Sequence, residues 1–429
     1  MLRRLAPLAL FALTAYFLVI PLFRPRGLFG WGHYRLVDVY LGIPLLLLTI
    51  IALAYAFDAS RRFVKPLASI VVSTLVTVVI AEIGYTIFVG GLFNSPQPTD
   101  AWFDGTSISL DYNIPDNERG FVRKPGVFWE GAAIPGGKTI TYRTDERGYR
   151  NATGITQADV VFIGDSFTEA ATVPEADTFV QLLGQRLNRS VVNLGTGYYS
   201  PQQELLTLER VGLSYAPKVV VWQIFEGNDL SDATRFALWK QNPIKPMTWG
   251  QRYARSSLLT RALNLTLPRD AGELRPLKLN DGSSGSVDLD YHYKPDEPAT
   301  ESLGFAETKK TIEDGFRLAQ SHNIKLIVVF VPIKVRVLAP YISFRDDNDK
   351  NFYLPGGNDE APGDFGNSLA AYCKDLGCPF IDATAALKEK AKTDDRFVYM
   401  TVHDSHLDVD GHKAVADSVE PLLRAALGN

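Results

Sequence analysis

The sequence predicts an α/β domain with a parallel sheet and helices on both faces, preceded by three membrane-spanning helices. Two observations carry this prediction. Short β-branched runs alternate with helical patterns from about position 159 to the C-terminus, which indicates a parallel sheet that is covered on both sides. Three long apolar stretches occupy the first 95 of the 429 residues, and each approaches or exceeds the roughly 20 residues that a bilayer crossing requires.

The three apolar stretches cover positions 5–23, 36–57 and 67–93. A cleaved signal peptide is the alternative for the first, but no small-residue cleavage site clearly follows it. The third holds a single charged residue, Glu82, which disfavours a buried soluble helix and predicts that Glu82 faces another helix or a polar cavity. We therefore expect a membrane anchor with three transmembrane helices over residues 1–93.

Basic residues in the short loops predict the orientation of this anchor. Five lie on one side of the predicted spans and three on the other: Arg3, Arg4, Arg61, Arg62 and Lys65 against Arg24, Arg26 and Arg35. This favours an N-terminus inside the cell. Because the number of spans is odd, the chain after position 93 is expected outside the cytoplasm, on a multi-pass protein whose partner is the lipid bilayer.

The rest of the chain divides into two predicted parts. Residues 94–158, rich in Pro, Gly and aromatic side chains, are expected to form a linker and lead-in segment. Residues 159–429 are expected to form the α/β domain, with an insertion at about 230–300. Its strands are predicted at 160–163, 191–194, 219–225, 325–331 and 380–381. Its helices are predicted at 179–187, 202–211, 305–322, 369–376 and 414–427.

Polar residues follow the first three predicted strands, at the sheet edge where ligands bind in such folds. Ser166 stands on a strand-to-helix turn, where its hydroxyl would be exposed near backbone N–H groups that can stabilise an oxyanion. An ordinary helix cap is the alternative. A Gly-rich turn with Gly197 follows the second strand. Asn228 follows the third, and its amide suits either an oxyanion or a turn.

A fourth polar signal covers positions 403–412, just before the last predicted helix. His406 and Asp404 are candidates for a general base and the carboxylate that orients it. The alternatives are a solvated polar loop and a metal site formed by His403, His406, His412 and the carboxylates of this segment.

In this order, the four signals resemble the four blocks of the SGNH hydrolases, also called GDSL-like esterases. The matching positions are 164–166, 197, 227–229 and 404–406. The resemblance spans roughly 145 to the end, and 145–150 is similar to a lead-in of exported bacterial members. The Asp-x-His spacing of the fourth block resembles the branch related to alginate O-acetylation proteins, and it leaves Asp408 as an alternative to Asp404. The second block also aligns with Tyr198 in place of Gly197.

The resemblance implies a three-layer α/β/α domain and a catalytic triad of Ser166, His406 and Asp404. It also implies an oxyanion hole formed by the backbone N–H of Ser166, the N–H at Gly197 and the side-chain amide of Asn228. It implies neither a metal nor an organic cofactor.

Three functions follow as hypotheses. The first is a serine esterase acting on acyl esters, acetyl esters above all, of an extracytoplasmic glycan. The second is an O-acyltransferase that acetylates a cell-envelope polysaccharide with the same triad and a membrane acyl-donor protein as partner. The third is a non-catalytic, membrane-bound glycan-binding module. Nucleic acid is excluded as a partner, since 44 basic and 48 acidic residues give a net charge of −4 without a basic run.

Two further features stay open at the level of sequence. Cys373 and Cys378 could pair in an oxidising compartment or stand as two buried thiols at a helix end. Lys334 follows the fourth predicted strand and faces either the site or solvent.

Overall fold

The computed structural model describes a defined set of residues in two compact units. The described residues are 10–16, 42, 45–52, 61–88, 112–132, 138–241, 274–289, 302–353, 365–394, 396–402 and 404–428. One unit comprises Met1–Ser107 with Lys245–Asp270, and the other comprises Ile108–Ile244 with Ala271–Asn429. Each unit is described here by itself.

The first unit contains helix α3 (Arg61–Phe88), which covers most of the third apolar stretch. Two further helical pieces, at 10–16 and 45–52, are joined by a hydrogen bond of 2.9 Å between the Thr14 and Thr49 hydroxyls. Among the described residues, none of the helices combines the length and apolar character needed to cross a membrane. This finding does not support the three expected transmembrane helices or a bilayer partner, and much of the first two stretches lies outside the described residues.

The second unit is built on a five-stranded parallel sheet with the strand order β11-β10-β7-β5-β6. Its strands are β5 (Val160–Ile163), β6 (Val191–Asn193), β7 (Val219–Phe225), β10 (Lys325–Val331) and β11 (Phe380–Asp382). Their β-branched runs are almost wholly buried in the three central strands, as expected when both faces of a parallel sheet are covered. The predicted parallel sheet is therefore confirmed, with strand ends within one residue of the prediction.

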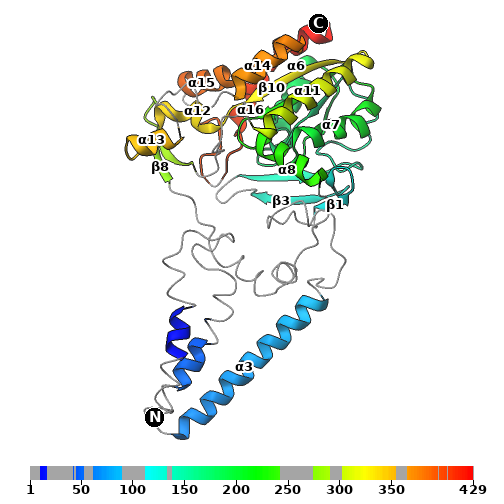
Figure 1. Ribbon diagram of the computed structural model, residues 1–429. Helices are drawn as coiled ribbons and strands as arrows, with labels where there is room; N and C mark the ends of the chain where they lie inside the picture. The colour runs from blue at the N-terminus through cyan, green and yellow to red at the C-terminus, as the bar shows by residue number, and fades with distance from the viewer. Residues whose placement is uncertain are drawn as a thin grey trace. The chain divides into compact units, whose positions relative to one another are not determined.

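Helices cover the two faces of this sheet (Figure 1). Alternate strand residues pack in two separate cores, because successive side chains point to opposite faces. One core includes α6 (Phe179–Leu187), α12 (Lys334–Leu338), α15 (Thr384–Thr393) and α16 (Val409–Leu427). The other includes α7 (Pro201–Arg210), α8 (Asp229–Gln241), α11 (Leu303–Ser321) and α14 (Phe365–Leu376). The sheet and its two helical layers make the three-layer arrangement.

The linker and lead-in segment belongs to this same unit from Ile108 onward. It forms two antiparallel pairs, β1 (Asn113–Asp116) with β2 (Gly120–Arg123), and β3 (Phe128–Ala132) with β4 (Thr139–Arg143). The Tyr199 hydroxyl donates to the carbonyl of Phe121 at 2.6 Å, and Gln203 Nε2 donates to the carbonyl of Arg119 at 2.6 Å. These contacts fasten β2 to the turn and helix that follow β6.

The residues after β4 close the edge of the sheet. The Asn151 side chain pairs with the backbone of Asn193, accepting from its N–H at 2.8 Å and donating to its carbonyl at 2.9 Å. A side-chain amide thus imitates a neighbouring strand beside β6, whose edge would otherwise lack a partner here.

The insertions contain more regular structure than the sequence predicts. Segment 230–300 begins within α8 and contains the hairpin β8 (Leu274–Lys278) with β9 (Ser284–Asp288). Helix α13 (Asp347–Tyr353) lies in the polar stretch after α12. Helix α15 was not predicted, because its run of Ala and Lys carries little apolar periodicity. Cys373 and Cys378 are both buried and carry free thiols.

Candidate active site

Ser166 is held at the end of β5 by a tight turn. It is the first residue of the short helix α5 (Ser166–Glu169) and is half-buried, whereas Gly164 and Asp165 before it are buried. A Cβ atom on Gly164 would come within 2.3 Å of Thr168 Oγ1, so only glycine fits there. Asp165 caps the helix by accepting from the N–H of Phe167 at 2.9 Å. Asp165 therefore shapes the turn that presents the Ser166 hydroxyl.

His406 and Ser166 meet although 240 positions separate them. The distance between His406 Nε2 and Ser166 Oγ is 2.6 Å. On the other side of the ring, His406 Nδ1 lies 2.6 Å from Asp404 Oδ1. The same carboxylate oxygen accepts from the backbone N–H of His406 at 2.7 Å. The short Asp-x-His spacing therefore lets one oxygen fix both the loop and the ring.

The other residues of the 403–412 segment have separate roles. Asp408 caps α16, accepting from the N–H of Gly411 at 2.8 Å, and so does not orient His406. His412 is buried and stacks on Phe179, whose backbone N–H lies 3.3 Å from His412 Nδ1. Burial lowers the pKa of His412 to about 3, which keeps this ring neutral. His403 lies outside the described residues.

The opposite charges of His406 and Asp404 shift the pKa of each group. Burial alone would lower the pKa of His406, but the charge and hydrogen bond of Asp404 outweigh it and raise the pKa above its usual value. Burial would raise the pKa of Asp404, yet His406 and, more weakly, Lys334 bring it below the usual value. The carboxylate thus stays ionised while the imidazole is made a stronger base.

Lys334 lies beneath this pair and is almost fully buried, at 1% exposure. Its Nζ donates to the backbone carbonyl of Asp404 at 2.8 Å and reaches the carbonyl of Thr401 at 3.4 Å. Lys334 therefore holds the loop that carries Asp404 and His406. The open question about this residue is answered by its position: it faces the site from below and is not solvated.

The proposed oxyanion donors point largely to carboxylates. The N–H of Gly197 donates to Glu169 Oε2 at 2.6 Å. The Asn228 amide donates to Asp232 Oδ2 at 2.6 Å and also reaches Asp165. The structure therefore brings Gly197 next to Ser166 and Asn228 next to Asp165, but the donors of both contact carboxylates.

The residue after Gly197 offers the alternative alignment of the second block. Tyr198 has a φ of 70°, a left-handed conformation that a bulky side chain rarely adopts. Strain of this kind, on the order of 1–3 kcal/mol, is typical of functional sites. The backbone at Tyr198 thus has the conformation that a glycine would favour, which supports placing the second-block position at Tyr198.

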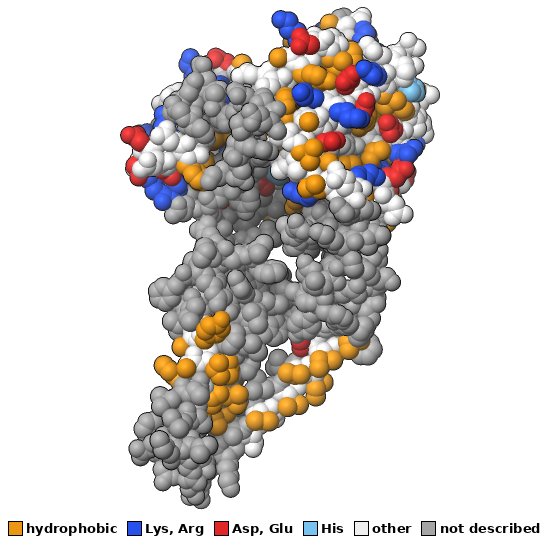
Figure 2. Space-filling view, in the orientation of Figure 1, with side chains coloured by type: hydrophobic (Ala, Val, Ile, Leu, Met, Phe, Trp, Pro, Cys, Tyr) orange, Lys and Arg blue, Asp and Glu red, His pale blue; other side chains and the backbone are white. Residues whose placement is uncertain are grey.

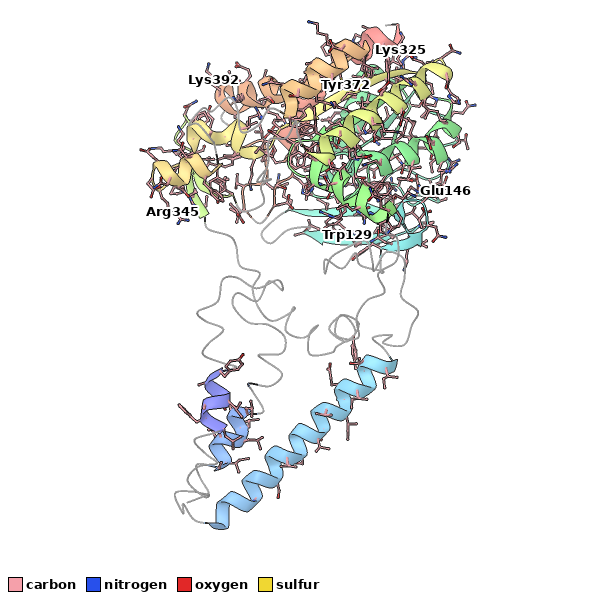
Figure 3. All side chains as sticks on the ribbon, viewed as in Figure 1. Trp129, Glu146, Lys325, Arg345, Tyr372 and Lys392 are labelled. Atoms are coloured by element: carbon pink, nitrogen blue, oxygen red, sulfur yellow. The ribbon has the colours of Figure 1, made fainter. Side chains whose placement is uncertain are left out.

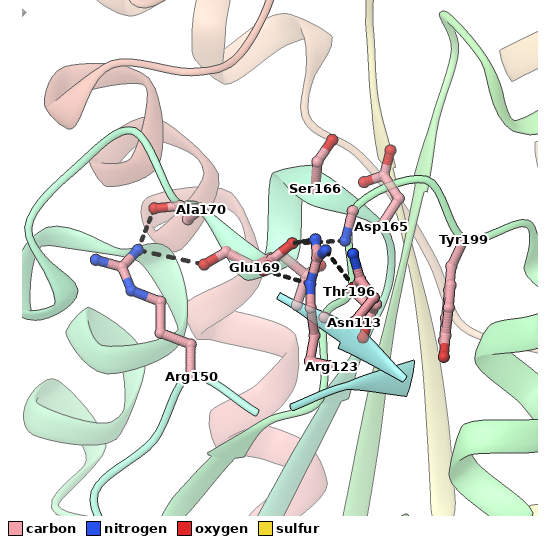
Figure 4. A network of polar contacts seen from close by, with 12 residues as sticks. Asn113, Arg123, Arg150, Asp165, Ser166, Glu169, Ala170, Thr196 and Tyr199 are labelled. Carbon is pink, nitrogen blue, oxygen red and sulfur yellow. Dashed lines mark hydrogen bonds and ion pairs between the residues drawn. The ribbon is translucent and has the colours of Figure 1, made fainter. Parts of the chain in front are cut away.

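Glu169 is the centre of a network that the sequence did not reveal (Figure 4). Its two oxygens accept from Arg123 Nε at 3.0 Å and Nη2 at 2.6 Å, and from the Tyr142 hydroxyl at 2.5 Å. Burial would raise the pKa of Glu169, but Arg123 and the hydrogen bonds bring it below the usual value. Arg123 and Tyr142 come from β2 and β4, so the lead-in strands supply part of the site.

Arg150 fixes the other end of α5. Its guanidinium donates to the carbonyl of Ala170 and reaches the Glu169 carbonyl at 3.3 Å (Figure 4). It also donates to the carbonyl of Val173 at 2.7 Å. These carbonyls follow the end of the helix, where the backbone lacks helical partners. The lead-in motif at 145–150 therefore anchors the element that begins with Ser166.

A group of buried carboxyls lies behind the Ser166 turn. Burial raises the pKa of Asp165 and of Asp232 to about 6, and it raises those of Glu204 and Asp229 well above their usual values. Glu204 accepts from Trp222 Nε1 at 2.7 Å. Repulsion between these neighbouring carboxylates raises their pKa values further, so the cluster favours the protonated forms.

Comparisons with known proteins give weak structural likenesses. No protein-family model matches the chain, and no curated protein matches it. A lipolytic protein of the G-D-S-L family from Desulfitobacterium hafniense is 16% identical, covering 61% of this chain and 98% of its own, with a TM-score of 0.33. An acylhydrolase from Bacteroides fragilis is 15% identical, covering 62% and 87%, with a TM-score of 0.33.

A catalytic mutant of an acetylxylan esterase from Geobacillus stearothermophilus is 14% identical, covering 63% of this chain and 94% of its own, with a TM-score of 0.33. The structural neighbours are thus GDSL-like acylhydrolases and acetylxylan esterases. With TM-scores and identities this low, nothing about the activity of this chain is taken from them.

Proposed function

We propose that the chain is a serine ester hydrolase in which Ser166 is the nucleophile, His406 the general base and Asp404 the carboxylate that orients it. The observation that carries this proposal is the continuous line of polar contacts from Asp404 through both ring nitrogens of His406 to the Ser166 hydroxyl, 2.6 Å at each step. A nucleophile within reach of a base that is itself oriented by a third group is typical of acyl-transfer sites.

The arrangement supports a two-step reaction. Asp404 keeps the proton on Nδ1, which leaves the lone pair of Nε2 facing the Ser166 hydroxyl. Ser166 Oγ attacks the ester carbonyl while His406 takes its proton. His406 then gives this proton to the departing alcohol, and an acyl-serine is left. A water molecule, deprotonated by His406, attacks the acyl-serine and releases the carboxylic acid and the free Ser166.

Stabilisation of the oxyanion requires donors that are not already committed. We infer that the backbone N–H of Ser166 takes this part. The N–H of Gly197 would contribute only after it released Glu169. Asn228 would contribute only after its amide turned away from Asp232. Each such donor is worth about 10²–10³ in rate.

The test is covalent labelling of the full chain. A serine-reactive phosphonate is expected to modify Ser166 and to stop the hydrolysis of an aryl acetate, and Ser166→Ala is expected to remove both effects. Unchanged acetate release by Ser166→Ala would refute the proposal and favour the hypothesis of a non-catalytic glycan-binding module.

Hydrolysis and transfer differ in whether water or a sugar hydroxyl takes the acyl group from Ser166. Acetate release that does not change when oligosaccharide acceptors are added would support hydrolysis. Formation of an acetylated oligosaccharide would instead support the O-acyltransferase. The extracytoplasmic location and the membrane acyl-donor protein stay predictions of the sequence.

A further inference from the structure

A pocket opens beside the site on the lead-in strands. It is lined by side chains from the residue before β1, from β2, β3 and β4, and from α5, including Tyr112, Arg123, Trp129, Tyr142, Thr144 and Glu169. Glu169 thus belongs both to the pocket and to the network around Ser166. The triad does not use this pocket, so it is available to another part of a substrate.

One wall of the pocket is aromatic. Trp129 and Tyr142 stand opposite each other in the β3–β4 register. Their rings stack with centroids 5.3 Å apart and an interplanar angle of 10°. Trp129, labelled in Figure 3, lies on the lead-in strands of the second unit and not in the sheet. Its neighbour Phe128 points to the opposite face of the strand and is 67% exposed.

The floor of the pocket is polar but electrically neutral. Arg123 and Glu169 form a buried ion pair, with side chains 14% and 5% exposed, so their charges cancel. Three of the five guanidinium N–H groups of Arg123 donate to Glu169 and Asn113. Among the described residues, two N–H groups therefore remain for a ligand.

The floor also lies directly against the nucleophile. A Cβ atom on Gly197 would be 2.9 Å from Glu169 Oε2, 3.0 Å from Arg123 Nη2 and 3.4 Å from Ser166 Cβ. One residue thus separates the ion pair from Ser166. A ligand in the pocket and an ester at Ser166 can therefore belong to one molecule.

We propose that this pocket binds a neutral pyranose ring of an acylated glycan, one sugar unit or less from the ester attacked by Ser166. The apolar C–H face of the ring lies on Trp129, and its hydroxyls meet the two remaining N–H groups of Arg123. An alkyl chain would leave this polar floor without partners. An anionic sugar would gain little, because Glu169 already neutralises Arg123. This inference rests on the proposed role of Ser166.

Binding is tested without catalysis. Calorimetry on the full chain uses unacetylated oligomers of glucose, galactose, mannose, xylose and N-acetylglucosamine, and an oligouronate. At least one neutral oligomer is expected to bind, with affinity reduced about tenfold or more in Trp129→Ala. Trp129→Phe keeps an aromatic face and is expected to restore most of the affinity. The matched control Phe128→Ala, on the opposite face of β3, is expected to bind as the wild type does.

The catalytic arm separates this inference from the proposed function. Trp129→Ala is expected to lower kcat/KM for the acetylated form of the bound oligomer about tenfold more than it lowers kcat/KM for the aryl acetate, whereas Phe128→Ala is expected to leave the ratio of the two unchanged. Absence of binding by every neutral oligomer, tighter binding of the oligouronate, or equal binding by Trp129→Ala would overturn the inference. Binding that depends on Trp129 without any Ser166-dependent hydrolysis would overturn only the proposed function.

Discussion

At the scale of single residues, the site depends on one carboxylate oxygen. Asp404 Oδ1 accepts from both the backbone and the ring of His406. Asp404 and Asp408 were both candidates for the carboxylate that orients His406, and their contacts distinguish them. Asp404 contacts the imidazole, whereas Asp408 caps α16.

Substitution distinguishes the two aspartates. Asp404→Asn is expected to lower kcat by about 10³–10⁴, because an amide at this position no longer favours the required tautomer. Asp408→Asn is expected to retain most activity, since asparagine caps helices about as well as aspartate. Esterase assays on the two variants, with melting curves for both, measure this. A larger loss from Asp408→Asn would contradict the assignment.

The pKa of His406 predicts the pH dependence. Asp404 raises this pKa above the usual value of about 6.5. The base form is lost as the pH falls through this raised pKa, so the acid limb of kcat/KM is expected to lie above pH 6.5 or so. In Asp404→Asn the residual activity is expected to show this limb at lower pH. A profile measured from pH 5 to 9 tests both statements, and an unshifted limb in the variant would count against them.

Sequence patterns pointed to Ser166, His406 and Asp404, which the structure brings together, but not to the residues that support them. Ser166 follows a buried strand and His406 precedes a helix, so local pattern and family resemblance point to both. The roles of Glu169 and Lys334 could not be predicted, because each role depends on a contact with a residue far along the chain, 46 and 70 positions away. For Gly197, the sequence places the turn correctly but does not indicate that its N–H already has a partner.

At the scale of elements, the lead-in strands act as a clamp on α5. Arg123 and Tyr142 reach Glu169 from β2 and β4, and Arg150 holds the carbonyls beyond the helix. The sequence predicts the sheet strands because their Val and Ile runs are buried on both sides. For β1–β4 it predicts a linker and lead-in segment without individual strands, because each of these strands has only four or five residues and pairs with a single partner.

The clamp can be measured as a coupling energy. Arg123→Ala leaves Glu169 buried without its cation and is expected to cost about 3–5 kcal/mol of unfolding free energy. The double variant Arg123→Ala/Glu169→Gln is expected to lose less than the two single losses added together. Urea unfolding measures all three.

A surface pair provides the control for this cycle. Arg210 and Glu118 are joined at 2.7 Å with side chains 53% and 49% exposed. Arg210→Ala is expected to cost far less unfolding free energy than Arg123→Ala, because solvent screens an exposed ion pair. Equal costs at the two pairs would show that Arg123 does not act as a buried clamp.

At the scale of the whole second unit, charge is distributed unevenly between surface and interior. On the face shown in Figure 2, basic and acidic side chains are interspersed. The interior instead holds the cluster of four buried carboxyl side chains described above, those of Asp165, Glu204, Asp229 and Asp232. Because burial raises their pKa values, the folded state keeps protons on these carboxyls at pH values where the unfolded chain has already released them.

This linkage has a definite sign. A carboxyl whose pKa is raised by folding contributes stability below its unfolded pKa, about 4.3 for glutamate, and loses it as the pH rises toward the folded value. Glu204→Gln removes the ionisation and can still accept from Trp222. We expect its melting temperature to exceed that of the wild type by a few degrees at pH 8 and by little at pH 5. Equal shifts at both pH values would contradict the linkage.

The position of Arg123 also sets a limit on how the protein can be shortened for laboratory work. A fragment that started at Asp159, where the sheet begins, would keep Ser166, His406 and Asp404 yet lack the cation that neutralises Glu169 and the guanidinium of Arg150. Such a fragment would carry a bare interior charge one helical turn from its own nucleophile. The compact unit begins at Ile108, and a working truncation should begin no later.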